Sequence, residues 1–160
     1  MTRETPWQVH LSGEIHTDWR ERIRTAAEER NLPVRFSAPI CDHAASDDVG
    51  ARILGEEVDS FWRDRKGAGV NAIRTRTQLE RADLVVVRFG EKYRQWNAAF
   101  DAGLAAALGK PLVIVHPPEL GHALKEVDAA AMAVCSEPEQ VAELLEYVTR
   151  EESGAPASAR

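Results

Sequence analysis

The 160-residue sequence lacks most of the features that mark secreted, membrane or metal-binding proteins. Its only two cysteines, Cys41 and Cys135, lie far apart without a CxxC spacing, so we expect buried free thiols rather than a disulfide or a metal site. It has no apolar leader, and no run approaches the roughly 18 apolar residues of a membrane span. These absences predict a cytoplasmic protein without a membrane partner.

Long basic runs are also absent, and the net charge is −6. A nucleic-acid-binding protein usually presents a basic face that neutralises phosphates, so we expect no nucleic-acid partner. The chain is long enough for one domain with a full core. We expect this domain to span residues 1–150 and residues 151–160 to form a disordered tail.

Phosphate-binding loops are missing as well. No GxGxxG follows the first predicted strand, no GxxxxGK[ST] occurs, and Glu14 stands where a pyrophosphate would lie. We therefore expect no nucleotide cofactor. Asp42, His43, Asp47 and Asp48 with His16 match no standard ligand spacing, so no metal ion is predicted. Ser12 has no GxSxG context, which disfavours a serine hydrolase.

Apolar periodicity and turn residues predict strands that alternate with helices. Such βαβ units indicate an α/β fold with a five-stranded parallel sheet, for which 2-1-3-4-5 is the best strand order. The predicted strands cover residues 7–12, 34–38, 83–89, 111–116 and 131–135. The predicted helices cover residues 17–31, 49–58, 68–81, 95–108, 119–129 and 138–149.

In this strand order the winding reverses between the first and third strands. Ligands of open α/β sheets bind at the carboxyl ends of strands at such a switch point. The loops expected there are residues 13–18 and 90–97, and both are rich in polar side chains. The sequence therefore predicts the functional site between these two loops.

Asn97 and Asp101 share one face of the Ala-rich helix that follows the third strand. Asp101 is either a solvent-facing or dipole-stabilised side chain, or a carboxylate in a cleft that acts as a nucleophile or base. Trp96 is either a core or lid aromatic residue or a platform on which a planar ring stacks. His16 is either a surface residue or an acid or ligand in the cleft.

Several motifs together closely resemble the bacterial YtoQ family over nearly the whole chain. They are LSGEIHTDWR at residues 11–20, FGEKYRQWNAAFDAG at 89–103, PICDH at 39–43, SDDVG at 46–50, and Arg74-Thr75. The family is distantly similar to the nucleoside 2-deoxyribosyltransferase superfamily. That resemblance implies a flavodoxin-like (Rossmann-like) three-layer domain, a nucleoside or nucleotide ligand, and a homo-oligomer whose sites are completed by a neighbouring subunit.

The resemblance also implies a catalytic residue. The superfamily helix that carries the nucleophilic glutamate matches Phe100 to Pro111, and the nucleophile falls on Asp101. Asp101 is one methylene shorter than glutamate, which retracts the carboxylate by about 1.5 Å. The turn before the nucleophile reads Gln95-Trp96-Asn97-Ala98 in place of Asp-x-Gly-Thr, and an acid that relatives carry falls near Thr75.

These observations lead to an enzyme hypothesis in which Asp101 attacks the anomeric carbon of a nucleoside or nucleotide, as in retaining glycosidases. Glu14 or His16 would handle the proton of the departing base. A non-catalytic nucleoside- or nucleotide-binding module is the alternative, and a hydrolase of another modified metabolite that uses the Asp/His-containing loop is a third. The predicted ligand-binding residues are Gly13, Asp42, His43, Arg74, Tyr93, Gln95, Trp96 and Asn97.

Overall fold

Five parallel strands form one sheet in the order β2-β1-β3-β4-β5, which confirms the predicted topology. The computed structural model describes residues 5–92 and 94–150, except for the side chains of residues 43 and 44. The predicted tail at 151–160 lies outside the described residues. The strands are β1 (Trp7–Gly13), β2 (Val34–Ser37), β3 (Leu84–Arg88), β4 (Leu112–Val115) and β5 (Ala133–Cys135).

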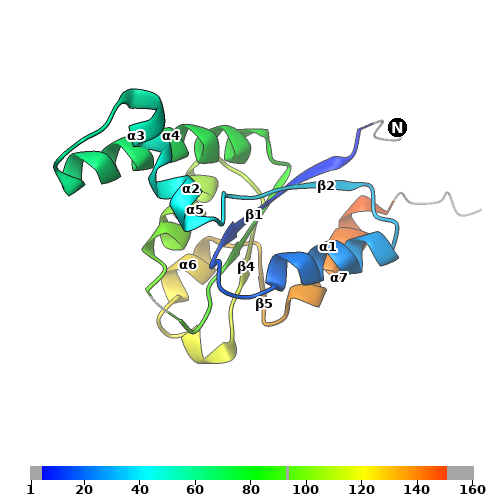
Figure 1. Cartoon of the computed structure of the whole chain (residues 1–160). Helices are drawn as coiled ribbons and strands as arrows, with labels where there is room; N and C mark the ends of the chain where they lie inside the picture. Colours follow the sequence, from blue (N-terminus) through cyan, green and yellow to red (C-terminus); the bar gives the residue numbers. More distant parts are fainter. Residues whose placement is uncertain (1–4, 93, 151–160) are drawn as a thin grey trace, which may run out of the picture.

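Helices cover both faces of the sheet and make a three-layer structure (Figure 1). α1 (Trp19–Glu29) and α7 (Pro138–Thr149) pack on one face, where Leu11, Ile23 and Val141 belong to the same buried cluster. α5 (Trp96–Ala107) and α6 (Lys125–Ala130) pack on the other face. A short 3₁₀ turn at Pro118–Leu120 and α6 replace the single predicted helix 119–129.

The central strand β3 shows why this sequence makes a three-layer sheet. Successive side chains of a strand point to opposite faces, and Val-rich runs suit strands that are buried on both faces. Val86 lies in the cluster under α1 and α7, whereas Val85 and Val87 lie in the cluster under α5. β3 therefore joins the two halves of the core, and its end carries Arg88 and Phe89 to the edge where the polar loops begin.

A helical arm projects beyond the sheet and consists of α3 (Val49–Leu54) and the outer part of α4 (Ser60–Arg81) (Figure 1). The short helix α2 (His43–Asp47) leads into it. The predicted helix 49–58 ends early because the backbone turns at Gly55, with φ +93°. The predicted helix 68–81 begins earlier, at Ser60, because the Asp59 side chain caps it by accepting from the Phe61 amide at 2.8 Å.

α4 is long enough to reach from the sheet to the end of the arm, but only Gly67 and Leu79 among its residues are buried. Within the part of the chain that the structure describes, no helix has both the length and the apolar character that a membrane crossing requires.

Candidate functional site

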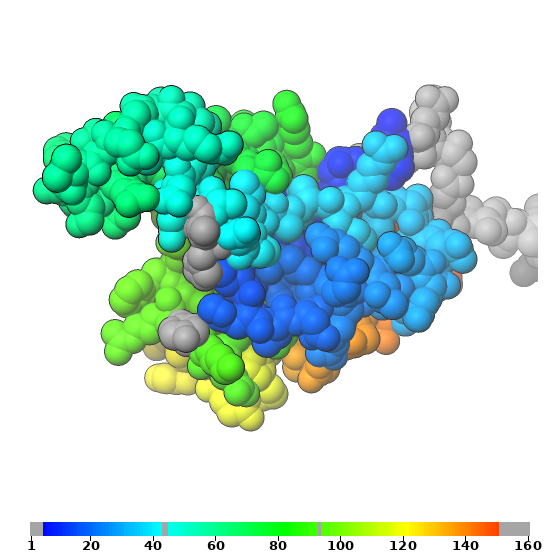
Figure 2. All heavy atoms as spheres, in the orientation of Figure 1, coloured from blue at the N-terminus to red at the C-terminus, as the bar shows by residue number. Residues whose placement is uncertain are grey.

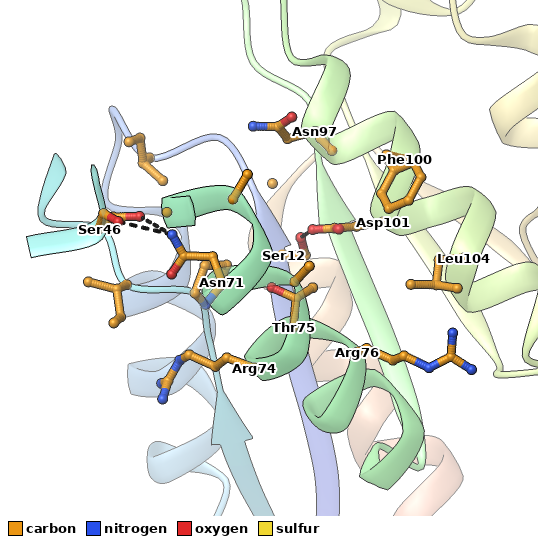
Figure 3. Close-up of a pocket in the computed structure, with 18 of the residues that line it drawn as sticks. Ser12, Ser46, Asn71, Arg74, Thr75, Arg76, Asn97, Phe100, Asp101 and Leu104 are labelled. Carbon is orange, nitrogen blue, oxygen red and sulfur yellow. Dashed lines mark hydrogen bonds between the residues drawn. The ribbon is translucent and has the colours of Figure 1, made fainter. Parts of the chain in front are cut away.

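A cavity of about 750 Å³ opens beyond the carboxyl end of β1, between α4 and α5 (Figure 3). It lies at the switch point between β1 and β3, where ligands of such sheets bind. Its volume falls within the range of roughly 300–1,000 Å³ that is usual for small-molecule sites. Its polar lining includes Ser12, Ser46, Asp47, Asp64, Asn71, Arg74, Thr75, Arg76, Asn97 and Asp101.

Asp101 is one of the residues that line this cavity. α5 packs its alanine face on the sheet through Ala98, Ala102 and Ala105, and this packing places Asp101 over the end of β1. The Ser12 hydroxyl donates a hydrogen bond to Asp101 Oδ2 (Figure 3). Burial raises the pKa of the Asp101 carboxyl above its ordinary value, and the hydrogen bond from Ser12 offsets only part of this rise.

The second carboxylate of the predicted site, Glu14, faces its own turn instead. Its Oε2 accepts from the backbone amides of His16 at 2.6 Å and Thr17 at 3.2 Å, and its Oε1 accepts from the Thr17 hydroxyl. Arg88 Nε lies 3.4 Å from Oε1. Burial alone would raise the pKa of Glu14, but these hydrogen bonds and the Arg88 charge outweigh burial and lower it. Glu14 thus holds the turn and does not line the cavity.

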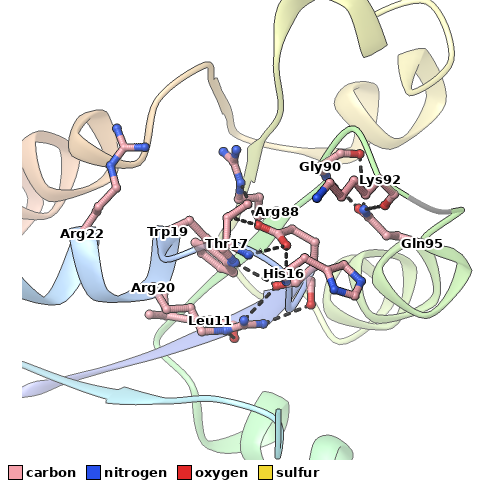
Figure 4. Close-up of polar contacts among 12 residues, drawn as sticks. Leu11, His16, Thr17, Trp19, Arg20, Arg22, Arg88, Gly90, Lys92 and Gln95 are labelled. Carbon is pink, nitrogen blue, oxygen red and sulfur yellow. Dashed lines mark hydrogen bonds and ion pairs between the residues drawn. The ribbon is translucent and has the colours of Figure 1, made fainter. Parts of the chain in front are cut away.

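Arg20 fixes the backbone of the same turn from below (Figure 4). This buried guanidinium donates to three main-chain oxygens: from Nε to Leu11 at 3.0 Å, from Nη1 to Glu14 at 2.8 Å, and from Nη2 to Gly13 at 3.0 Å. The Trp19 indole Nε1 also donates to the main-chain oxygen of Glu14, at 2.9 Å. The WR pair of the GEIHTDWR motif therefore builds the chain segment that presents Ser12.

Position 13 of this turn accommodates only glycine. Its φ of +116° lies in the left-handed region, and a Cβ there would meet the Arg88 carbonyl oxygen at 2.2 Å. The absence of a side chain lets the end of β1 approach β3 closely, and Glu14 N continues the ladder to Arg88 O at 3.0 Å.

α4 forms the opposite wall through one of its faces. Asn71 and Thr75 are four residues apart and both line the cavity, as does Arg74. Asn71 Nδ2 donates to the backbone oxygen and to Oγ of Ser46, both at 3.0 Å, which ties α4 to the chain after β2 (Figure 3). The wall therefore offers hydroxyl, amide and guanidinium groups to a polar ligand.

Four of the predicted site residues line the cavity together: Gly13, Arg74, Asn97 and Asp101. Glu14, His16, Asp42, Gln95 and Trp96 do not line it. Asp42 is exposed and accepts from the Ala45 amide at 3.2 Å, at the start of α2. The side chain of His43 and the whole of Tyr93 lie outside the described residues.

Gln95 and Trp96 have other positions. The Gln95 side chain closes the loop after β3, because its Oε1 accepts from the Gly90 amide at 2.8 Å and its Nε2 donates to the Lys92 oxygen at 2.7 Å. The Trp96 side chain is exposed, and the Arg94 guanidinium lies 6.0 Å from its ring centroid. A planar ring that stacked on Trp96 would lie outside the cavity that contains Asp101.

Sequence reasoning missed Ser12, Asn71 and Thr75 as members of the site. For Ser12 the available signal was its alternation with Leu11, which places its side chain on the face opposite the α1 core. For Asn71 and Thr75 it was their helical spacing. No three His, Cys, Asp or Glu side chains gather into a possible metal site anywhere in residues 5–92 and 94–150 that the structure describes.

Residues 10–149 match the family described as Nucleoside 2-deoxyribosyltransferase YtoQ. The chain belongs to the YtoQ family. It is 40% identical over 140 residues to the "Uncharacterized protein YtoQ" of Bacillus subtilis (strain 168), and the alignment covers 88% of this chain and 95% of that protein. The resemblance inferred from the motifs is thereby confirmed.

Solved structures show the same fold in more distant proteins. A 2-deoxyribosyltransferase of the psychrotolerant bacterium Bacillus psychrosaccharolyticus is 15% identical, with a TM-score of 0.51 and coverage of 84% of this chain and 90% of that one. A conserved protein of Enterococcus faecalis V583 is also 15% identical, with a TM-score of 0.59 and coverage of 90% and 99%. The YtoQ chain thus has the fold of the 2-deoxyribosyltransferases.

Proposed function

We propose that this YtoQ protein cleaves or exchanges the N-glycosidic bond of a nucleoside or nucleotide, with Asp101 as the nucleophile. The observation that carries the proposal is the Asp101 carboxylate in the cavity, with one oxygen held by the Ser12 hydroxyl. A nucleophile needs a fixed direction and an open space beside it for the reacting carbon. Membership of the YtoQ family supports a reaction at the N-glycosidic bond. The shared fold with a 2-deoxyribosyltransferase supports a site at this edge of the sheet.

In the first proposed step, Asp101 attacks the anomeric carbon while the C–N bond breaks through an oxocarbenium-like transition state. The base leaves with the electron pair of that bond and takes a proton, and a glycosyl ester remains on Asp101. In the second step an acceptor base or water attacks the same carbon and loses a proton. The bond between this carbon and the Asp101 oxygen breaks as the new bond forms, its electron pair stays on the oxygen, and the Asp101 carboxylate is restored.

The other lining groups suit a sugar or base edge. Asn97 stands one turn before Asp101 on α5 and can bind a hydroxyl group or a ring nitrogen. Thr75 and Asn71 line the cavity from α4, and Arg74 adds a positive charge that suits a phosphate group if the ligand is a nucleotide. Within the described residues no ion pair involves Asp101, so no fixed cation competes with a ligand for its carboxylate.

A non-catalytic binding module is the second candidate, and one observation favours it. Glu14 and His16, the residues predicted to handle the proton of the departing base, do not line the cavity, and Glu14 is held by its own turn. Asp47 and Asp64 are the other carboxylates of the lining. A binding module would keep ligand affinity and show no bond cleavage.

Incubation of the purified protein with 2′-deoxynucleosides, ribonucleosides and their 5′-monophosphates, with and without an acceptor base, separates the two candidates. The proposal expects base release or base exchange for at least one substrate, loss of turnover in Asp101→Asn, and normal turnover in the surface variant Asp18→Asn. A ligand-induced thermal shift without cleavage of any compound would support the binding module instead. The oligomeric state and the cytoplasmic location stay predictions.

A further inference from the structure

The two walls of the cavity have different tasks in the reaction proposed above. When a carboxylate displaces a base, the nucleophile and the leaving base lie on opposite sides of the reacting carbon. Asp101 lines the cavity from α5, and α4 forms the opposite wall. A base attached to that carbon is therefore directed toward α4. This step rests on the proposed function, whereas the chemistry of the α4 wall does not.

The cavity face of α4 has room for a planar ring. Gly67, Ala68 and Ala72 line the cavity and carry no side chain larger than a methyl group. Ile40 and Phe100 line it from other elements and offer apolar surface against which a ring packs. Figure 2 shows the arm, which contains the outer part of α4, overhanging the side of the molecule that carries α5. The polar side chains of α4 can therefore meet the edge of a base.

Asn71 presents a hydrogen-bond acceptor on this wall. Its Nδ2 donates to the main-chain oxygen and to Oγ of Ser46, both at 3.0 Å. A main-chain oxygen can only accept, so the amide cannot turn over without placing two carbonyl oxygens against each other. Figure 3 shows Nδ2 turned toward Ser46 and Oδ1 turned away from it. Among the described residues none donates to Oδ1, which leaves this oxygen to a ligand.

Thr75 adds a hydroxyl group one turn further along the same wall. No described residue bonds to its hydroxyl, and side chains four residues apart on a helix lie about 5–6 Å apart at Cβ. Asn71 and Thr75 can therefore contact one edge of the same base. Adenine and cytosine present an amino group beside a ring nitrogen, so the amino group suits Asn71 Oδ1 and the nitrogen accepts from Thr75. Hypoxanthine and uracil present a carbonyl oxygen and an N–H at these positions.

We infer that Asn71, held by Ser46, makes the cavity selective for bases that carry an exocyclic amino group. A base with a carbonyl oxygen at that position leaves Asn71 Oδ1 unpaired and opposite another acceptor. The surroundings act in the same direction. Asp47 follows Ser46, Asp64 lies about two turns before Asn71 on α4, and both carboxylates line the cavity without a hydrogen bond or ion pair to a described residue.

Calorimetric titration with matched nucleosides tests the selectivity. The pairs are 2′-deoxyadenosine with 2′-deoxyinosine and 2′-deoxycytidine with 2′-deoxyuridine, whose bases differ at the amino position. Asp101→Asn is the protein used, because asparagine keeps an oxygen that can accept from Ser12 and removes the proposed nucleophile. The amino member of each pair is expected to bind about ten- to a hundredfold more tightly, the usual effect of one unpaired buried acceptor. In the wild type, kcat/KM is expected to show the same preference.

Two substitutions on α4, each added to Asp101→Asn, separate the roles of the wall residues. Asn71→Leu removes the acceptor at similar volume and is expected to bring the ratio of the dissociation constants of each pair close to one. Thr75→Val is expected to weaken both members by about tenfold and to keep the ratio, because a hydroxyl group can donate or accept. Thr77→Val makes the same change where the hydroxyl bonds to the Ile73 oxygen of its own helix, outside the lining, and is expected to change neither value.

The outcomes separate this inference from the proposed function. Equal binding within both pairs, tighter binding of the carbonyl members, no binding of any of the four at millimolar concentration, or an unchanged ratio in Asn71→Leu would overturn the selectivity, even if the wild type cleaves nucleosides. Amino selectivity without cleavage in the wild type would keep it and contradict the proposed reaction. Circular dichroism checks that Asn71→Leu folds without its bond to Ser46, and the ratios with intact Asn71 and with Thr75→Val stand without that variant.

Discussion

The Ser12 hydroxyl at the end of β1 donates a hydrogen bond to Asp101 Oδ2 on α5. It joins the two chain segments that carry the family motifs, across 89 residues of sequence. A hydroxyl donor stabilises the ionised carboxylate and fixes one of its oxygens, whereas burial favours the protonated form. The protonation equilibrium of Asp101 therefore depends on a side chain that no spacing rule connects with it.

Ser12→Ala tests this dependence. Burial raises the pKa of Asp101, and the hydrogen bond from Ser12 lowers it. Removal of the hydroxyl leaves only the effect of burial, so the pKa of Asp101 is expected to rise. The acidic limb of the kcat/KM profile is expected to move to higher pH, since a nucleophilic carboxylate must be ionised. An NMR titration of the Asp101 carboxyl carbon gives the same comparison without a substrate. Ser60→Ala, at an exposed position on the arm, serves as the control, and an unchanged pKa in Ser12→Ala would contradict the assigned role.

The turn at Gly13 gives a stability prediction with a matched pair of glycines. Gly13→Ala places a Cβ within 2.2 Å of the Arg88 oxygen at a φ of +116° and is expected to destabilise the fold by about 3 kcal/mol or more. Gly103 lies inside α5 with no atom within 4 Å of an added Cβ, so Gly103→Ala is expected to stabilise by up to about 1 kcal/mol. Urea unfolding measures both, and equal effects would show that the turn is not constrained.

Arg20 gives a second stability prediction. Arg20→Met leaves the main-chain oxygens of Leu11, Gly13 and Glu14 without their guanidinium donor, at an expected cost of about 3 kcal/mol. Arg24→Met removes only a partly exposed ion pair with Glu21 and is expected to cost less than about 1 kcal/mol. Urea unfolding of both variants makes the comparison. Similar costs would mean that Arg20 does not hold the turn.

His10 makes stability depend on pH. Burial, followed by the charges of Arg20 and Arg74, lowers its pKa from 6.5 to about 4. Because the folded pKa lies below the unfolded one, the unfolded chain binds the extra proton between pH 6.5 and 4, and stability falls as the pH falls through this range. The loss attributable to His10 between pH 7 and pH 5 is about 2 kcal/mol.

Urea unfolding of the wild type and of His10→Gln at these two pH values isolates the contribution of this residue. The variant is expected to show the smaller loss of stability between pH 7 and pH 5. The same pH dependence in both proteins would assign the acid sensitivity to other groups.

Much of the fold could be predicted from local pattern. The Val-rich run before Arg88 and the Ala-rich helix after it define a buried βα unit, and alternation of such units fixes a parallel sheet. The arm was predicted less well. Its helix begins at Ser60 because of the Asp59 cap, and its direction depends on the contact between Gly50 and Gly67, which no periodicity encodes.

The part of the site that follows a local pattern could also be predicted from the sequence, whereas the part that depends on tertiary contacts could not. Asp101 and Asn97 could be found because one helix face carries both. Glu14 was expected to take part in chemistry, but its carboxylate accepts from the His16 and Thr17 amides and the Thr17 hydroxyl of its own turn, and its sequence position does not reveal this. Asn71 and Thr75 reach the cavity only because the long helix α4 crosses beside β1, which is a tertiary relationship.

Mass spectrometry of protein quenched during turnover tests the central claim most directly. After incubation with a cleaved deoxynucleoside and rapid acid quenching, the account predicts a glycosyl ester on the peptide that contains Asp101. This adduct should be absent in Asp101→Asn and should disappear when an acceptor base is added before the quench. Turnover without any adduct on that peptide, or an adduct on another carboxylate of the cavity such as Asp47 or Asp64, would contradict Asp101 as the nucleophile.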